Sequence, residues 1–172
     1  MNLQSDDFEL FGLQRRFAQD RTQLDARWKD LQRQAHPDKF AAQGAAAQRI
    51  AMQWSVRINE AYQRLKTPLK RAAYLCELQG APVNAENNTA MPAVFLLQQM
   101  QWREDLEAAH SPESLEQIRL QVKQAVRDIL QKIERLMDHQ GAYSEAAAEV
   151  RALMFIERFE QDVDSRLDQI ET

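Results

Sequence analysis

Few side chains in this sequence have the types and the spacing that catalysis requires. An enzyme needs a nucleophile and a base, or a set of metal ligands, within reach of one another. The histidines His36, His110 and His139 are each isolated, and the carboxylates of Glu104 and Asp105 are expected to face solvent. The single cysteine, Cys76, excludes an internal disulfide and cannot form a metal site alone. We therefore expect no catalytic residue, no metal, no cofactor and no enzymatic activity.

The tripeptide His36-Pro37-Asp38 places an imidazole and a carboxylate on either side of a proline. Proline cannot continue a helix, and it disfavours helical geometry in the residue before it. A helix that runs up to Ala35 should therefore end close to His36. The sequence predicts an exposed polar turn at this tripeptide.

Amphipathic helices are predicted on both sides of the turn. Asp20 is suited to cap the first helix, and Gln23 stands at the capping-box spacing from it. Apolar residues recur at helical spacing in both segments, namely Leu24, Trp28, Leu31 and Ala35 before the turn and Ile50, Trp54, Ile58, Ala61 and Leu65 after it. Because only about ten polar or small residues separate them, the two helices should form an antiparallel hairpin with the tripeptide at its tip.

This arrangement resembles a J-domain. Two further segments match that family, residues 8–13 (Phe-Glu-Leu-Phe-Gly-Leu) before the first long helix and residues 58–62 (Ile-Asn-Glu-Ala-Tyr) within the second. The short segment 5–11 should form a helix that covers the open end of the hairpin. The alternative is a polar helix–helix turn that binds no partner.

Composition favours an all-α fold. The chain of 172 residues has four Gly and five Pro, and it is rich in Ala, Leu, Gln, Glu and Arg. No apolar run is longer than five residues and no signal-peptide pattern opens the chain, so we expect a cytoplasmic protein without a membrane partner.

The net charge of −4 conceals two halves of opposite sign. Residues 1–75 hold 13 Lys and Arg against 8 Asp and Glu, a net charge of +5, and the remaining residues hold 9 against 18, a net charge of −9. The two halves should therefore meet different partners. Positive residues in the first half are dispersed, without a recognition helix or an array of stacking aromatics, so nucleic acid is not an expected partner.

Three domain segments are predicted: a first domain at 1–79, a linker at 80–88 and a helical domain at 89–172. Thr67 and Pro68 can begin a further helix that Gly80 ends. Beyond the linker, helices are expected from about Pro92 to Ala109, from Ser111-Pro112 to about Gln140, and from Ser144 nearly to the end. The last two carry matching apolar stripes, Ile118, Val122, Ala125, Ile129, Ile133 and Leu136 on one and Ala152, Ile156, Phe159, Val163, Leu167 and Ile170 on the other.

The segment 92–109 has two apolar faces. Phe95, Trp102, Leu106 and Ala109 share one face, which is expected to be core. A second face, opposite the first, gathers Leu97, Met100 and Glu104, with Leu96 and Gln101 beside them. Exposed Leu and Met among polar residues are typical of a protein-binding patch, which Phe155 could join. The alternative is a helix buried on both sides.

Over nearly its whole length the chain resembles the HscB family of J-domain co-chaperones. Residues 68–75 (Pro-Leu-Lys-Arg-Ala-Ala-Tyr-Leu) resemble that family's junction, and residues 95–100 with Arg103 and Glu104 resemble its scaffold-binding helix. The resemblance implies an L-shaped arrangement of a J-domain hairpin and a C-terminal three-helix bundle. It also implies a co-chaperone that brings the iron–sulfur scaffold IscU to the DnaK-type chaperone HscA and stimulates ATP hydrolysis by HscA.

The resemblance also assigns residues to two surfaces. The chaperone-binding residues would be His36, Pro37 and Asp38, with Lys29, Arg33 and Lys39 steering the turn toward an acidic surface. Asp25 and Asp30 occupy positions at which many J-domains carry a positively charged residue. The scaffold-binding residues would be Leu96, Leu97, Met100, Gln101, Glu104 and Phe155, with Gln101 in place of a commonly acidic residue. The competing hypotheses are a general J-domain co-chaperone with a different client and an interaction scaffold with no chaperone partner.

Overall fold

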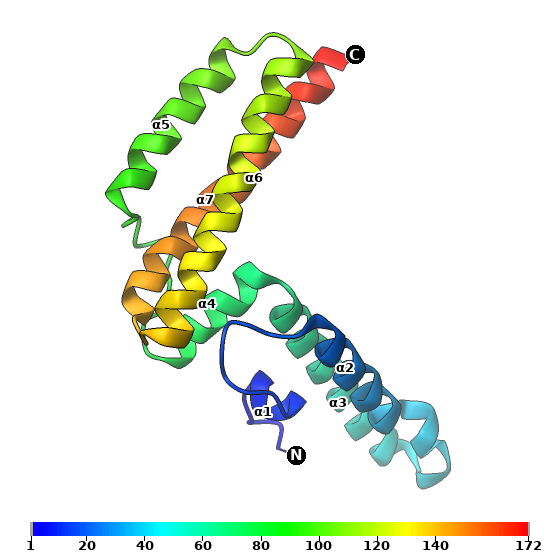
Figure 1. The fold of residues 1–172 in the computed structure, drawn as a ribbon. Coiled ribbons are helices and arrows are strands. Elements are labelled where there is room, and N and C mark those ends of the chain that lie inside the picture. Colours follow the sequence, from blue (N-terminus) through cyan, green and yellow to red (C-terminus); the bar gives the residue numbers. More distant parts are fainter. Residues whose placement is uncertain (1, 172) are drawn as a thin grey trace. The chain divides into compact units, whose positions relative to one another are not determined.

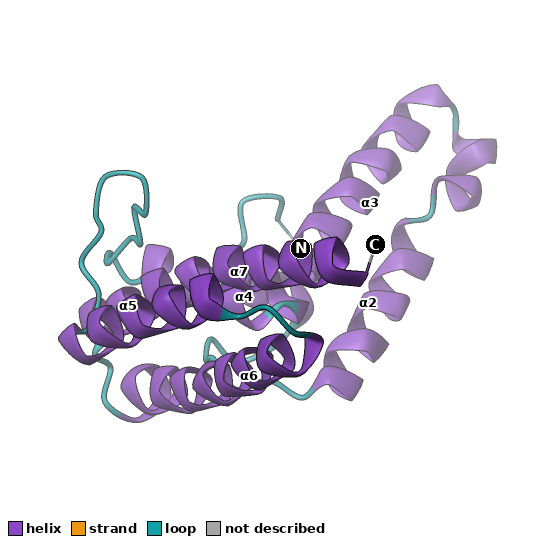
Figure 2. Cartoon of the chain, turned by 90° about the horizontal axis from the view of Figure 1, so that it is seen from above, coloured by secondary structure: helices purple, strands orange, loops and turns teal. Residues whose placement is uncertain are grey.

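A computed structural model describes residues 2–171, apart from the side chain of residue 171. The described residues form helices joined by loops and contain no strand (Figure 2). The chain divides into two compact units, one up to Leu75 and one from Cys76 onward. The all-α fold expected from composition is confirmed.

The first unit contains the predicted hairpin. It comprises α1 (Asp7–Phe11), α2 (Arg21–Ala35), a 3₁₀ helix η1 (Pro37–Gln43), α3 (Ala45–Lys66) and the greater part of α4 (Pro68–Leu78). Helices α2 and α3 run side by side, and η1 joins them at the tip (Figure 1). The predicted start of the first long helix is correct, because the Asp20 side chain accepts hydrogen bonds from the backbone N–H groups of Thr22 and Gln23.

The core of the first unit is built on the predicted apolar spacing. Leu24 on α2 and Ile58 and Leu65 on α3 are each about 1% exposed or less, and Phe8 and Phe11 of α1 close the open end of the hairpin. Burying such a side chain stabilises the fold by roughly 1.5–3 kcal/mol. The short helix α1 therefore contributes two buried aromatic side chains that cover the open end of the hairpin.

The second unit contains α5 (Ala93–Ala108), α6 (Pro112–Glu134), a π-helical turn η2 (Arg135–His139) and α7 (Tyr143–Glu171). Helices α6 and α7 lie side by side over most of their length (Figure 1). Members of both predicted stripes are buried, with Ile133 of α6 and Ile156 and Phe159 of α7 at 1% exposure or less. The Ser111 side chain caps α6 by accepting from the N–H of Ser114 at 3.2 Å.

Two predicted bounds differ from the structure. The α-helical part of α6 ends at Glu134 and continues as the π-helical turn, so the predicted stop near Gln140 describes the end of both together. The first short helix begins at Asp7, because the Asp6 side chain caps it by accepting from the N–H of Glu9 at 2.9 Å.

Candidate functional site

The His36-Pro37-Asp38 turn is exposed and held by its own side chains. His36 ends α2 with an extended backbone, and Pro37 is the first residue of η1. The backbone N–H of Asp38 donates to Nδ1 of His36 at 3.3 Å, so a neutral imidazole carries its proton on Nε2. The side chains of His36 and Asp38 are 56% and 91% exposed. The turn can therefore offer a donor and a carboxylate together to a partner.

The three basic side chains expected beside the turn are exposed, but their surroundings differ. Arg33 forms an ion pair with Asp30 one turn earlier on α2. For Lys29 and Lys39, no carboxylate lies within ion-pair distance among residues 2–171. Most of the unbalanced positive charge near the turn therefore comes from the two lysines.

The two acidic residues at customarily basic positions are both paired. Asp30 is neutralised by Arg33, as described above. Asp25 accepts hydrogen bonds from Tyr62 Oη at 2.6 Å and from Arg21 Nε at 2.8 Å. These two bonds hold the pKa of the Asp25 carboxyl below its usual value, and the bond from Tyr62 has the larger effect. Both carboxylates thus serve contacts within the hairpin.

A hollow of about 490 Å³ lies between α2 and α3 next to the turn. Its apolar walls include Phe40, Trp54 and Ile58. Ile50, which the helical spacing placed on the core stripe, is 56% exposed at this hollow. The stripe interpretation is wrong at Ile50, which lies at the open hollow near the tip, whereas Ile58 nearer the open end of the hairpin is buried.

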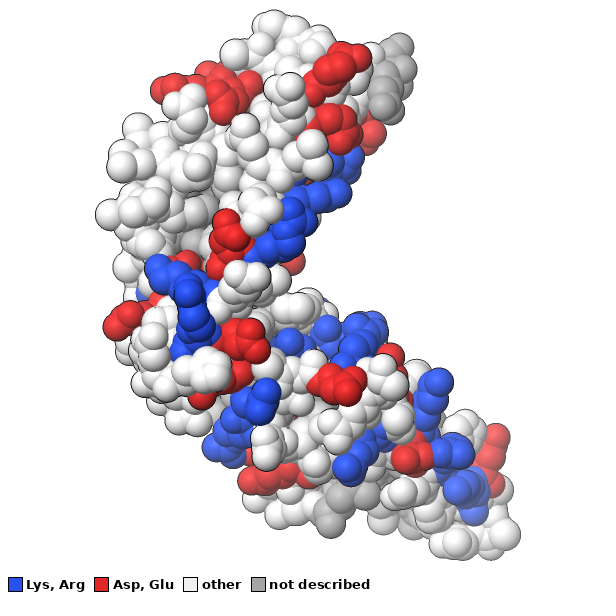
Figure 3. All heavy atoms as spheres, viewed as in Figure 1, with Lys and Arg blue, Asp and Glu red and all other residues white. Residues whose placement is uncertain are grey.

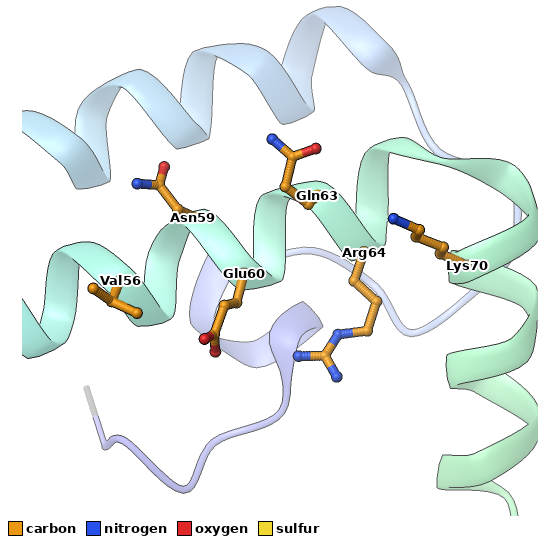
Figure 4. A pocket seen from close by; sticks show the side chains of 6 residues that line it. All are labelled: Val56, Asn59, Glu60, Gln63, Arg64 and Lys70. Atoms are coloured by element: carbon orange, nitrogen blue, oxygen red, sulfur yellow. The ribbon is translucent and has the colours of Figure 1, made fainter.

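A second hollow of about 590 Å³ runs along the outer side of α3 (Figure 4). Its lining combines Val56, Asn59, Glu60, Gln63 and Arg64 of α3 with Lys70 of α4. In the close-up, Glu60 and Arg64 extend toward α1, and Asn59 and Gln63 extend toward α2. Arg64 forms an ion pair with the buried Asp7 at 2.7 Å, so the other charged side chains of this hollow are Glu60 and Lys70.

Helix α5 has the two faces that the sequence predicts. Phe95 and Trp102 are 7% and 2% exposed and make an edge-to-face contact at 6.1 Å, and Trp102 stacks on Phe159 of α7. On the other face Leu97 is 70% and Met100 60% exposed. Leu96 and Val94 are exposed as well. The surface over α5 shows few charged side chains in Figure 3, with acidic ones gathered toward one end of the helix.

Phe155 of α7 lies beside α5. Its ring contacts Phe95 edge-to-face at 5.9 Å, and the guanidinium of Arg103 lies 5.2 Å from its centroid. Glu104 and Gln101 are exposed, and Gln101 donates to Asp105 at 2.9 Å. The six residues assigned to scaffold binding therefore lie on α5 or against it.

Sequence reasoning missed two buried arginines. Arg71 donates to the backbone carbonyls of Phe17 and Leu65, and Arg151 donates to those of Val83 and Ala90. The available signal was an arginine within an otherwise apolar stretch, as in residues 71–76 and 150–156. Such a position implies that the charged group finds acceptors inside the fold.

Among the described residues, no group of three or more His, Cys, Asp or Glu side chains suited to a metal ion occurs. Cys76 is buried in α4, and this burial raises the pKa of its thiol to about 11. None of the helices formed by residues 2–171 combines the length and apolarity of a membrane span.

The hairpin and its exposed turn define the class of this protein, an all-helical J-domain protein. A protein of Burkholderia cenocepacia, "Co-chaperone protein HscB homolog", is 46% identical over 175 residues, which cover 100% of this chain and 99% of the relative. The chain belongs to the HscB co-chaperone family. The homologue of Burkholderia multivorans is also 46% identical over the same share of each chain.

Residues 91–164 match the family model described as the HSCB C-terminal oligomerisation domain. Among solved structures, chaperone HscB from Vibrio cholerae is 35% identical with a TM-score of 0.80, covering 96% of this chain and 99% of that one. Human co-chaperone protein HscB is 25% identical with a TM-score of 0.87, covering 100% and 86%. Both halves of the chain thus have the fold of this family.

Proposed function

We propose that this protein binds the iron–sulfur scaffold IscU through the exposed face of α5 and presents it to the DnaK-type chaperone HscA. The His36-Pro37-Asp38 turn then stimulates ATP hydrolysis by the chaperone, which promotes assembly or transfer of the cluster. The protein acts as a cytoplasmic co-chaperone and makes or breaks no covalent bond itself.

The observation that carries the scaffold half of this proposal is the row of exposed apolar side chains on α5. Leu97 and Met100 remain 70% and 60% exposed although the opposite face of the same helix is packed into the core. Exposed apolar side chains in such a row are characteristic of protein-binding surfaces, and the flexible Met side chain can adapt to a partner. Glu104, one turn beyond Met100, supplies a charge at the edge of this face.

The chaperone half rests on the exposed turn. A partner is driven toward its hydrolysing state only when the turn binds that state better than the other. The Asp38 carboxylate and the His36 imidazole can make such differential contacts because both are exposed. The bond from the Asp38 backbone N–H to Nδ1 holds the His36 ring against the backbone of the turn. The lysines beside the turn favour approach to an acidic surface.

Single-turnover ATP hydrolysis by HscA, measured with and without IscU, tests both halves. His36→Gln should abolish stimulation by the turn while leaving IscU binding unchanged. His139→Gln, the same substitution at an exposed histidine of η2, is the matched control and should stimulate normally. Stimulation that survives His36→Gln would reject the role of the turn.

The runner-up function is a general J-domain co-chaperone whose α5 face recruits a different client. The two functions separate in the same assay. In the proposed function, IscU increases the stimulation further, and Leu97→Ala with Met100→Ala removes that increase. A general co-chaperone would stimulate hydrolysis equally with and without IscU.

The name of the matching family model suggests a second occupant for α5, another copy of this chain. Sedimentation of the protein over a range of concentrations tests this function. A dimer that dissociates on Leu97→Asp would assign the exposed row to self-association, and IscU would then compete with the second copy.

A further inference from the structure

The segment between α4 and α5 contains no helix, yet α7 holds it at two points. Arg151 of α7 donates from Nε to the carbonyl of Ala90 at 2.6 Å and from Nη1 to the carbonyl of Val83 at 2.9 Å. The two carbonyls lie at either end of residues 83–90, whose side chains from Asn84 to Ala90 are exposed. One guanidinium therefore fixes both ends of this loop.

Arg151 depends strongly on these two acceptors. It is 7% exposed, and no carboxylate within residues 2–171 lies at ion-pair distance from it. A buried cation that loses its hydrogen-bond acceptors is costly, since it cannot regain water while it stays in the core. If the loop moved away from α7, the Arg151 guanidinium would lose both acceptors. This cost favours the arrangement in which residues 83–90 stay bound to α7.

Helix α5 begins at Ala93, three residues after Ala90, whose carbonyl Arg151 binds. Its N-cap is Pro92, which cannot make a side-chain hydrogen bond to the helix, so no side-chain cap fixes the start of α5. Its ring contacts with α7 come from Phe95 and Trp102, and Arg103 lies over the Phe155 ring. The bond from Arg151 to Ala90 is a polar contact between α7 and the segment that leads into the exposed row of α5.

We propose that Arg151 is a positioning residue for the partner-binding face of α5. It acts by fixing the loop 83–90 and thereby the place and orientation at which Val94, Leu97 and Met100 are presented. This inference rests on the proposed function, because it assumes that this face binds IscU. A face that is already ordered binds with less loss of conformational entropy.

Arg151→Met in the full-length protein tests the inference, because Met keeps a long side chain but removes the cation and its donors. The control is Arg158→Met, the same change at an exposed arginine of α7. We expect Arg151→Met to raise the IscU concentration for half-maximal stimulation of HscA by about tenfold while the maximal rate is unchanged. Amide hydrogen exchange should accelerate in residues 83–100 and stay slow in α6 and the rest of α7.

Two results would overturn the inference. One is an unchanged half-maximal IscU concentration in Arg151→Met. The other is faster exchange throughout α6 and α7, which would make Arg151 a general core residue. Leu97→Ala with Met100→Ala separates failure of the inference from failure of the proposed function: if this double variant still responds to IscU normally, the binding face itself is misassigned.

Discussion

Tyr62 of α3 donates a hydrogen bond of 2.6 Å to Asp25 of α2, and this bond ties the two helices of the hairpin together. The Tyr62 ring also stacks on Trp28 at 4.6 Å. Trp28 in turn donates to Asn59 at 3.0 Å, so a continuous polar and aromatic seam joins the helices. This seam fixes the geometry of the hairpin whose tip carries the turn.

Tyr62→Phe should destabilise the hairpin at neutral pH, because it removes the hydroxyl donor and keeps the ring on Trp28. The pKa of Asp25 is lowered first by the Tyr62 bond and then by Arg21. A carboxyl with a lowered folded-state pKa stabilises the fold above its ordinary value of 3.8, and this stabilisation is lost as the pH falls through the folded-state value. Urea midpoints of both proteins should therefore converge in acid. A difference that stays constant below pH 3.8 would contradict this role of the bond.

Leu97→Ala combined with Met100→Ala should change the free energy of unfolding by no more than about 1 kcal/mol, because both side chains are largely exposed. Trp102→Ala on the same helix should cost about 3–5 kcal/mol, since Trp102 is 2% exposed and stacks on Phe159. Denaturant unfolding of the two variants checks this contrast. Equal losses would mean that the outer row is part of the core.

Ile58→Ala should destabilise the first unit by about 2–5 kcal/mol, because Ile58 is 1% exposed. Ile50→Ala, two turns earlier on α3, should cost about 0.5 kcal/mol or less, because Ile50 is 56% exposed. Trp fluorescence during urea unfolding measures both. A similar loss of unfolding free energy in the two variants would show that Ile50 is part of the core, as the helical spacing predicts.

Lys29→Glu should slow association with HscA at low ionic strength and have little effect at about 1 M salt, where the Debye length is about 3 Å. Lys123→Glu changes the net charge by the same amount at an exposed position of α6. It should slow association less, because Lys123 lies outside the first unit. Stopped-flow association rates over a salt series distinguish the two variants. Equal slowing would indicate that net charge alone governs the encounter.

Local chemistry explains which parts of this fold the sequence could predict. Asp20 and Ser111 cap helices where they were expected to, and Gly80, with φ of +74°, follows the end of α4. These features depend on residues close in the chain. The two faces of α5 were also predictable, since helical periodicity separates Phe95 from Leu97 before any tertiary contact is known.

Tertiary contacts explain what the sequence could not predict. The burial of Asp7 depends on Arg57 and Arg64, each 2.7 Å away across the fold. The π-helical turn Arg135–His139, with Leu136 and Met137 buried, was not predicted from helical spacing, which expects a regular helix to about Gln140. The roles of the His36 turn and of the α5 face remain predictions that the binding experiments address.

The two buried arginines have a consequence for the order of folding. Arg71 and Arg151 each bind two carbonyl groups. The Phe17 carbonyl lies 54 residues from Arg71, and the Ala90 and Val83 carbonyls lie 61 and 68 residues from Arg151. The carbonyls of Phe17, Val83 and Ala90 lie outside the helices, so we expect their segments to reach the native conformation once the helix that carries the arginine has docked. Helices α2, α3, α6 and α7 should therefore pair early, and the segments before α2 and before α5 should become ordered last.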